Sequence, residues 1–331
     1  MTKAVKEHLI KSLAPGRFVS GQLLGEQLGI SRTAVAKHIK ALLGIGLDIF
    51  SVTGKGYKLA SPLSLLEKDI IISLLVGDSK ADRRTDIPRV EVHSLIDSTN
   101  DYLMRRLPNQ LSPGQVCLAE YQSAGRGRRG RQWVSPFGSQ IYLSMYWYLE
   151  QGLSAAMGLS LMTALAVSDA IKMHCGVQVQ LKWPNDVYLQ GVKLAGILIE
   201  LEGQALEPSH CVIGIGVNLN MPPEAGKLIE QQWTDLQSHS DVKINRNALS
   251  AQLINCLRQR LFAYQQAGLV PMLDEWHSHD AFLNKRVKLI TGEKVTHGIC
   301  RGVNGQGALL LEIDSQVKPI YGGEVSLRID E

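Results

Sequence analysis

Long apolar runs are missing from the sequence. No stretch approaches the roughly 18 uninterrupted apolar residues that a membrane-spanning helix needs. The first residues, Met1 to Ala4, lack the apolar segment and the cleavage site of a secretory signal peptide. We therefore expect a cytoplasmic protein that does not insert into a membrane.

Patterns for metal or disulfide sites are also scarce. The five cysteines are scattered along the 331 residues, and none forms a Cys-x-x-Cys pair. His277 and His279 lie close together, but no third ligand follows at the spacing of a metal site. The sequence thus predicts reduced, mostly buried thiols and no metal site built by a protein cluster.

The composition is that of a folded chain with more than one domain. With 331 residues and 45% hydrophobic composition, it can form a sizeable core and two or three domains. The formal charge of +4 permits an anionic partner without requiring one. The positions of the charges are therefore more informative than their sum.

The segment from Gly21 to Leu43 has the pattern of two short helices around a tight turn. We expect helices over 22–28 and 32–43, with Ser31 as the N-cap of the second. Three apolar residues of the second helix recur at helical spacing and should pack on leucines of the first. These residues are Val35, Ile39 and Leu42 in the second helix and Leu23, Leu24 and Leu28 in the first.

The opposite face of the second helix carries polar and cationic side chains, as a helix in a major groove requires, although an ordinary amphipathic helix would also fit. Strands expected at 49–52 and 57–59, joined by Thr-Gly-Lys-Gly, resemble the wing of a winged helix-turn-helix. Ser61-Pro62-Leu63 should then begin the passage to the next domain. The predicted DNA-binding residues are Gly21, Ser31, Arg32, Thr33, Lys37, Lys40 and Lys55.

The region from Leu65 to Gln266 alternates strand-like and helix-like segments, which predicts a mixed α/β domain. Expected strands cover 116–121, 141–148, 177–182, 195–201 and 212–217, and expected helices cover 100–106, 155–173 and 247–267. Short strands separated by glycine-bearing turns follow at 287–290, 295–299, 308–313, 317–321 and 324–327, and they predict a small β-barrel.

The segment Gly125–Trp133 combines glycines with four arginines. It satisfies G-x-G-x-x-G, but a dinucleotide-binding loop must open a helix, and Trp-Val-Ser-Pro follows instead. Glycine N–H groups and guanidinium groups suit a polyanionic ligand, and we expect the loop to be mobile when empty. An Arg-Gly nucleic-acid segment and a solvated charge run are the alternatives, and both are commoner in long low-complexity tails.

A second motif, Lys182-Trp183-Pro184-Asn185-Asp186, follows an expected strand. It places a cation, an aromatic face, an amide and a carboxylate on one rim, which suits a nucleotide and its Mg²⁺, with surface ion pairs as the alternative. Lys193 opens the next strand among apolar residues and glycines. A lysine in such surroundings is a candidate functional residue.

Four motifs occur in the order and spacing found in the biotin protein ligase family: residues 97–100, 125–131, 182–186 and 193–196. With the winged helix, the whole chain resembles the bifunctional branch of that family, the biotin-operon repressors. The resemblance implies a multidomain α+β protein with a winged helix-turn-helix at 1–63, a mixed α/β ligase domain at 64–275 and an SH3-like β-barrel at 276–331. The barrel would help ATP and carrier binding or serve packing alone.

The resemblance also implies roles for individual residues. Biotin and biotinyl-adenylate would contact Ser98, Thr99, Asn100, Gln122, Arg126, Gly127, Arg128 and Lys193. The catalytic cations would be Lys193, Arg126 and Arg128. ATP would contact Trp133, Lys182, Asn185, Asp186, Gly214, Gly216 and Asn218. Mg²⁺ would accompany ATP, with Asp186 as its candidate ligand. In the loop over the adenine, residues 222–233, only Trp233 gives an anchor.

The implied activity is that of an ATP-dependent biotin–[acetyl-CoA-carboxylase] ligase. It would form biotinyl-5'-AMP, transfer biotin to a lysine of the biotin carboxyl carrier protein, and repress the biotin operon as a homodimer with biotinyl-5'-AMP as corepressor. A sensor without chemistry and a lipoate ligase are the alternatives. The cations of the ATP side argue against a sensor, and the polar group around Asn100 suits a ureido ring better than a dithiolane. No general base for the transfer stands out; Asp186 is only a candidate.

Overall fold

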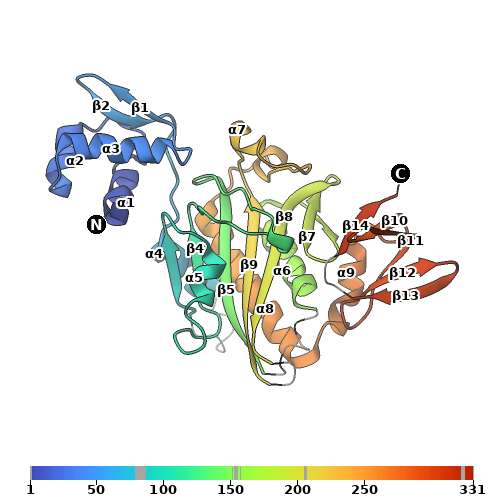
Figure 1. The fold of residues 1–331 in the computed structure, drawn as a ribbon. Helices are drawn as coiled ribbons and strands as arrows, with labels where there is room; N and C mark the ends of the chain where they lie inside the picture. The colour runs from blue at the N-terminus through green and yellow to red at the C-terminus, as the bar shows by residue number, and fades with distance from the viewer. Residues whose placement is uncertain are drawn as a thin grey trace.

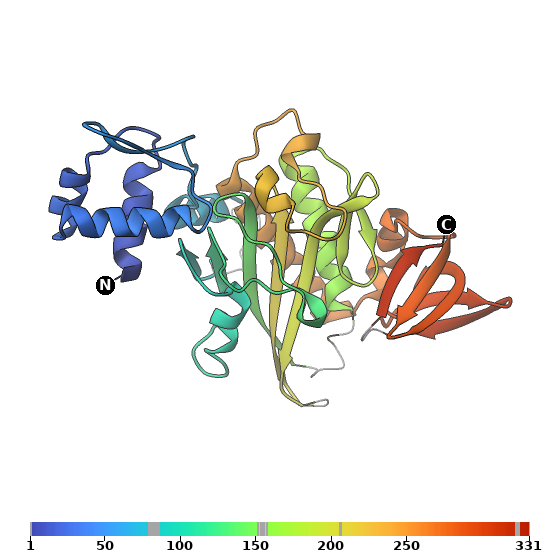
Figure 2. The same ribbon diagram turned by 45° about the horizontal axis from the view of Figure 1, so that its top comes forward.

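The protein has three parts in chain order, and its two termini lie at opposite ends in the computed structural model (Figure 1). The structure describes residues 2–78, 87–150, 152, 156, 158–204, 207–321 and 325–330. A helical part with a small hairpin comes first, a large sheet with helices second, and a small antiparallel sheet last (Figures 1 and 2). Among the described helices, none combines the length and apolar character that crossing a bilayer requires.

The first part consists of α1 (Thr2–Leu13), α2 (Gly21–Leu28), α3 (Arg32–Leu43), β1 (Ile49–Val52) and β2 (Gly56–Leu59). The expected N-cap is confirmed, because the Ser31 hydroxyl accepts the N–H of Ala34 at 3.2 Å. The β1–β2 hairpin is also confirmed, and Gly54 and Gly56 take the positive φ angles, 78° and 100°, that its turn requires.

The core of this part differs from the expectation in two ways. Val35, Ile39 and Leu42 are buried as expected, but Leu23 is 45% exposed. Leu23 and Leu24 are neighbours about 100° apart on one helix, so only Leu24 can face α3. Helix α1, which the sequence pattern did not single out, fills this core with Leu9, Ile10 and Leu13.

The second part is built on a seven-stranded sheet in the order β3-β4-β5-β9-β8-β7-β6. Its strands are β3 (Val90–His93), β4 (Val116–Ala119), β5 (Gln140–Leu149), β6 (Gln180–Lys182), β7 (Asp186–Leu189), β8 (Val192–Glu202) and β9 (Ser209–Asn218). Strands β3 and β4 are parallel, and the other pairs are antiparallel. The mixed α/β domain is therefore confirmed, although β6 is shorter than expected because residues 177–179 connect it to the preceding helix.

Helices cover the two faces of this sheet unequally. Helices α4 (Lys68–Asp78), α6 (Leu159–Cys175) and α8 (Arg246–Ala267) share one core with the sheet, whereas the short α5 (Thr99–Met104) packs on the opposite face. Strand β9 alternates accordingly: Ile213, Ile215 and Val217 enter the large core, and the residues between them face the other side. Those residues include Gly214 and Gly216, so the α5 side of the sheet is left open for a site. Of the helix expected at 155–173, residues 155 and 157 lie outside the described residues, and α6 begins at Leu159.

A buried ion pair anchors the segment between the first two parts. Arg246 and Glu120 are 2.6 Å apart with side chains 8% and 2% exposed. Arg246 also donates to the Ser64 carbonyl, and Glu120 accepts the Leu66 N–H. Since β2 ends at Leu59 and α4 begins at Lys68, the predicted boundary at 63/64 falls in this anchored segment.

The third part follows α7 (Pro223–Gly226) and α9 (Leu273–His279), and the predicted boundary at 275/276 falls inside α9. It contains β10 (Arg286–Thr291), β11 (Lys294–Val303), β12 (Leu309–Ile313), β13 (Gln316–Ile320) and β14 (Val325–Ile329). The expected strands are present, except that Glu324 lies outside the described residues. Their order is β13-β12-β11-β10-β14, and no pairing between β13 and β14 closes a barrel within the described residues.

Candidate active site

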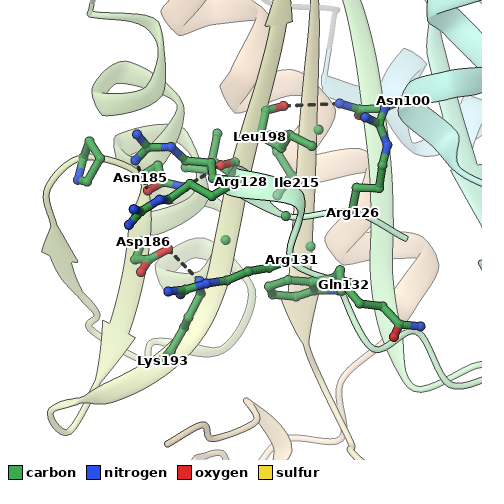
Figure 3. Close-up of a pocket in the computed structure, with 18 of the residues that line it drawn as sticks. Asn100, Arg126, Arg128, Arg131, Gln132, Asn185, Asp186, Lys193, Leu198 and Ile215 are labelled. Carbon is green, nitrogen blue, oxygen red and sulfur yellow. Dashed lines mark hydrogen bonds and ion pairs between the residues drawn. The ribbon is translucent and has the colours of Figure 1, made fainter. Parts of the chain in front are cut away.

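An open cavity lies on the α5 side of the central sheet, between the arginine-glycine loop and the β6–β7 turn (Figure 3). Asn100 and Arg126 lie on one side of it, and Asn185, Asp186 and Lys193 lie on the other (Figure 3). The structure thus brings together residues that are almost 100 positions apart in the chain. The predicted residues that line it are Ser98, Thr99, Asn100, Gln122, Arg126, Gly127, Arg128, Trp133, Lys182, Asn185, Asp186, Lys193, Gly214 and Gly216.

Asn218 is the predicted ligand-binding residue that does not line the cavity. Its side chain is buried and donates to the Thr234 carbonyl at 3.0 Å, so it holds the following loop. In that loop, Gln231 lines the cavity, whereas the Trp233 indole donates to the Gly226 carbonyl. Trp233 therefore anchors α7, and Gln231 is a lining residue that the sequence did not reveal.

Glycines form the floor of the cavity because aromatic and amide groups approach the sheet closely. A methyl group on Gly216 would lie 2.6 Å from the Trp133 ring, and one on Gly214 would lie 2.3 Å from Asn100 Oδ1. Trp133 is fixed in turn, since its Nε1 donates to Gln140 Oε1 at 2.8 Å. The alternating pattern of β9 thus places glycines where flat groups must lie against the backbone.

One end of the cavity is a buried network of neutral polar groups. The hydroxyl and the N–H of Thr99 both donate to Gln122 Oε1, at 3.1 and 2.9 Å. The Ser144 hydroxyl, which the sequence did not single out, lies 2.7 Å from Thr99 Oγ1 and 2.5 Å from Asn100 Oδ1, so its one proton can go to either oxygen. Ser98 caps α5 by accepting the N–H of Asp101. Because the network is satisfied internally, its remaining donors and acceptors have fixed directions.

Cations crowd the rest of the cavity. Its described lining contains six cationic side chains and one carboxylate, which is Asp186. The cationic residues are Arg126, Arg128, Arg129, Arg131, Lys182 and Lys193. This imbalance calls for an anionic ligand.

The arginines of the loop have different partners. Arg126 forms ion pairs with Asp101 and with Glu200, and Glu200 also accepts the Asn100 amide at 2.8 Å. Arg128 donates to Asn185 Oδ1 at 3.0 Å, and burial lowers the pKa of its guanidinium from the usual value. The acids Asp101 and Glu200 were not predicted, because one lies in a helix and the other at the end of a strand without a motif.

The two lysines of the cavity also differ. Lys193 Nζ lies 2.7 Å from Asp186 Oδ1 and 5.7 Å from the centre of the Trp133 ring. Lys182 Nζ donates to the Tyr188 hydroxyl at 2.7 Å, and burial lowers its pKa to about 8. Lys193 is therefore paired with a carboxylate, whereas Lys182 is hydrogen-bonded to a tyrosine hydroxyl.

The predicted DNA-binding residues lie in the first part of the chain. All of them are exposed except Gly21, which is buried where a side chain would meet the Tyr57 ring at 3.1 Å. The close packing of Gly21 against the hairpin is enough to explain why a glycine occupies this position, so no DNA contact is needed to explain it. Lys55 and Lys58 lie 5.8 and 5.7 Å from the centre of the exposed Phe18 ring, a cluster that the sequence did not indicate.

Comparison with known families agrees with this arrangement. Residues 92–218 match the Biotin/lipoate A/B protein ligase family, residues 282–328 the Biotin protein ligase C terminal domain, and residues 6–58 an HTH domain. The biotin protein ligase of Aquifex aeolicus, solved in complex with biotin and ATP, has a TM-score of 0.63 and 28% identity and covers 73% of this chain and 99% of its own. Fold and site thus define a biotin/lipoate protein ligase domain joined to a helix-turn-helix domain.

Full-length relatives narrow the assignment. The bifunctional ligase/repressor BirA of Escherichia coli (strain K12) is 48% identical over 98% of this chain and 97% of its own length. That of Bacillus subtilis (strain 168) is 30% identical over 99% of this chain and 100% of its own. The biotin–[acetyl-CoA-carboxylase] ligase of Paracoccus denitrificans is 36% identical over 69% of this chain. The chain belongs to the bifunctional biotin ligase/repressor family.

Proposed function

We propose that this chain is an ATP-dependent biotin protein ligase that also represses transcription of the biotin operon. The ligase would form biotinyl-5'-AMP and pass biotin to a lysine of the biotin carboxyl carrier protein of acetyl-CoA carboxylase. The observation that carries the proposal is one cavity with a neutral polar end, built around Asn100, and a strongly cationic end. A ureido ring fits the first and the phosphates of ATP fit the second.

The first step joins two anions, so charge decides its rate. The biotin carboxylate oxygen attacks the α-phosphorus, the bond to the β-phosphate oxygen breaks, and pyrophosphate leaves. Arg126, Arg128 and Lys193 are the cations that would stabilise the charge building up at the reacting phosphate. Because Lys193 pairs with Asp186 in the structure, its ammonium would have to share or exchange that partner with the ligand.

In the second step the carrier lysine amine attacks the acyl carbon. A C–N bond forms, the C–O bond to the phosphate breaks, and AMP leaves with the electron pair. The Trp133 ring on the glycine floor and the arginine-glycine loop would shelter the mixed anhydride from water. Asp186 stays a candidate base, and positioning and charge would supply most of the catalysis.

Magnesium fits as a companion of ATP rather than as a resident ion. The described residues contain no cluster of three metal-ligating side chains, and Asp186 is the carboxylate of the described cavity lining. Asp186 would therefore be the protein ligand of Mg²⁺ that arrives with the nucleotide. When bound, Mg²⁺ would neutralise phosphate charge.

The third part would contribute to ATP and carrier binding, and we propose an SH3-like fold for it. Its open order of five strands and the match to the Biotin protein ligase C terminal domain support this. The winged helix would bind the operator as a homodimer with biotinyl-5'-AMP as corepressor. Exposed Lys37 and Lys40 on α3 support the DNA contact.

The test is biotin-dependent pyrophosphate–ATP exchange, followed by gel filtration with radiolabelled biotin. We expect exchange and a retained, acid-labile adenylate that passes to purified carrier protein. Lipoate in place of biotin is the matched control. Binding of biotin without exchange would indicate a sensor, and exchange with lipoate alone would indicate a lipoate ligase.

A further inference from the structure

The ammonium group of Lys182 lies between two aromatic side chains. Its Nζ donates to the Tyr188 hydroxyl at 2.7 Å, which places it at the edge of that ring, 4.8 Å from the ring centre, and it lies 5.5 Å from the centre of the Phe282 ring. Tyr188 belongs to β7, whereas Phe282, 8% exposed, precedes the C-terminal sheet. Two segments of the chain almost 100 residues apart thus form an aromatic box around this one cation.

No carboxylate among the described residues lies within 4.0 Å of Lys182 Nζ. The nearby Asp186 forms its ion pair with Lys193 instead, at 2.7 Å. Burial is the main cause of the lowered Lys182 pKa of about 8; the charge of Asp186 opposes it, and the charges of Lys193, Arg328 and Arg131 lower the pKa further. The side chain nevertheless lines the cavity. Lys182 therefore presents to the cavity a partly buried charge that no carboxylate of the described residues contacts directly.

The third part of the chain holds the box in place. The Ala281 N–H donates to the Leu181 carbonyl at 2.8 Å, next to the boxed lysine. The Trp183 indole N–H donates to the Gly307 carbonyl at 3.1 Å. Leu327 of β14 completes the same wall of the cavity. Phe282 is thus positioned by contacts on both sides of Lys182.

The Tyr188 phenol oxygen and the Phe282 ring stabilise the cation without cancelling its charge, whereas a carboxylate would compete with an incoming anion. We propose that Phe282 and Tyr188 are positioning residues that hold the Lys182 ammonium for the phosphates of ATP. The inference rests on the proposed ligase function and gives the third part of the chain a defined role in it. The polyphosphate then meets a charge that is already oriented.

Calorimetric titration of the full chain with ATP tests the proposal. Phe282→Leu keeps an apolar side chain and removes the ring, and we expect it to raise the Kd for ATP roughly 2- to 30-fold. Phe282→Tyr should restore binding to within about 2-fold, because it keeps the ring. The Kd for biotin should stay unchanged in both variants, since biotin's ring end contacts the opposite end of the cavity.

Phe262→Leu is the matched control. Phe262 packs edge-on against Trp147, with ring centres 5.1 Å apart, and neither residue lines the cavity. It should lower thermal stability and leave the Kd for ATP unchanged. Tyr188→Leu tests the other wall of the box and should weaken ATP binding in the same manner, independently of how well the Phe282 variant folds.

The pH dependence gives a second readout. A protonated Lys182 binds phosphate better than a neutral one, so the affinity of the wild type for ATP should fall as pH rises through about 8. Opening the box admits water and raises the Lys182 pKa, so the fall should begin at higher pH in Phe282→Leu. Lys182→Gln should remove this transition.

The outcomes separate the two proposals. If Phe282→Leu and Tyr188→Leu bind ATP with the wild-type Kd and pH profile, the aromatic box has no positioning role, whatever the enzyme does. If the affinity of the wild type for ATP falls with pH as predicted but no biotin-dependent exchange occurs, the positioning role of Phe282 and Tyr188 is supported and the ligase function is refuted. If the wild type does not bind ATP, both are overturned.

Discussion

At the scale of single residues, the cations of the cavity differ chiefly in what the ligand must displace. Arg126 is held by two carboxylates and Lys193 by one, whereas Arg128 faces an amide oxygen. A ligand phosphate that reaches Arg128 adds a charged contact beside the Asn185 amide oxygen. A phosphate that reaches Lys193 must instead compete with Asp186. Arg128 should therefore contribute to adenylate retention as much as to its formation.

We predict that Lys193→Ala and Arg128→Ala each lower the rate of adenylate formation about 10²- to 10³-fold, the usual effect of removing one group that stabilises developing charge. The fold should persist, because neither side chain belongs to the apolar core. Single-turnover kinetics at saturating ATP and biotin measures the effect. Lys294→Ala, which changes an exposed lysine of β11, is the control. Wild-type rates in both cavity variants would refute the assignment.

The sequence predicted the residues that stand in motifs and missed those that have none. Lys182 to Asp186 and the arginine-glycine loop combine rare residue types, so their chemistry was visible in the sequence. Glu200 and Ser144 instead fill ordinary strand positions, and only the pairing of β5, β8 and β9 brings them to Arg126 and Asn100. Phe282 could not be related to Lys182 without the packing of the third part.

At the scale of elements, long apolar segments predicted the long strands and helices well. Strands β5 and β9 are ten residues each and are buried at nearly every position, so each forms a long apolar run in the sequence. The four-residue β3 carries too few repeats for a period to be reliable, whereas the short α5 was predicted at 100–106. Helix α1 was missed although it is amphipathic, because its apolar side chains acquire meaning only against α3.

Helix α3 is the element on which DNA binding depends. We predict that Lys37→Ala and Lys40→Ala each weaken operator binding and reduce the slope of log K against log salt by about one, if each lysine contacts one phosphate. Both side chains are exposed, so folding should be unaffected. Fluorescence anisotropy at several salt concentrations measures the slope, with Lys11→Ala on α1 as the control. An unchanged slope in the double variant would show that this face of α3 does not meet DNA.

At the scale of the whole molecule, the two predicted activities lie in different parts joined by one anchored segment. The Arg246–Glu120 pair holds that segment, and Arg246 also donates to the backbone of Gln140, whose side chain fixes Trp133. The winged helix is therefore tied through hydrogen bonds to the wall of the ligand cavity. These hydrogen bonds alone do not couple ligand binding to DNA binding. A switch between the two activities requires a second conformation of the protein that the ligand binds more tightly.

We predict that biotinyl-adenylate, rather than biotin or ATP alone, favours the dimer. The arginine-glycine loop gathers like charges; Arg126 is paired with Asp101 and Glu200, and an acyl phosphate in the cavity would offset the charge of the remaining arginines. Fixing the loop backbone would build a new surface beside the central sheet. Two protomers paired there would present two winged helices to a two-fold operator. Sedimentation equilibrium with and without adenylate measures the shift.

Linkage makes this prediction quantitative. If adenylate tightens dimerisation by some factor, dimerisation must tighten adenylate binding by the same factor. Arg128→Ala, which should retain adenylate poorly, should therefore lose the shift in the monomer–dimer constant along with its affinity. Unbiotinylated carrier protein would use the same surface, so an excess of it should return the wild type to monomers and release the operator. A monomer–dimer constant that adenylate leaves unchanged would mean that repression is controlled in some other way.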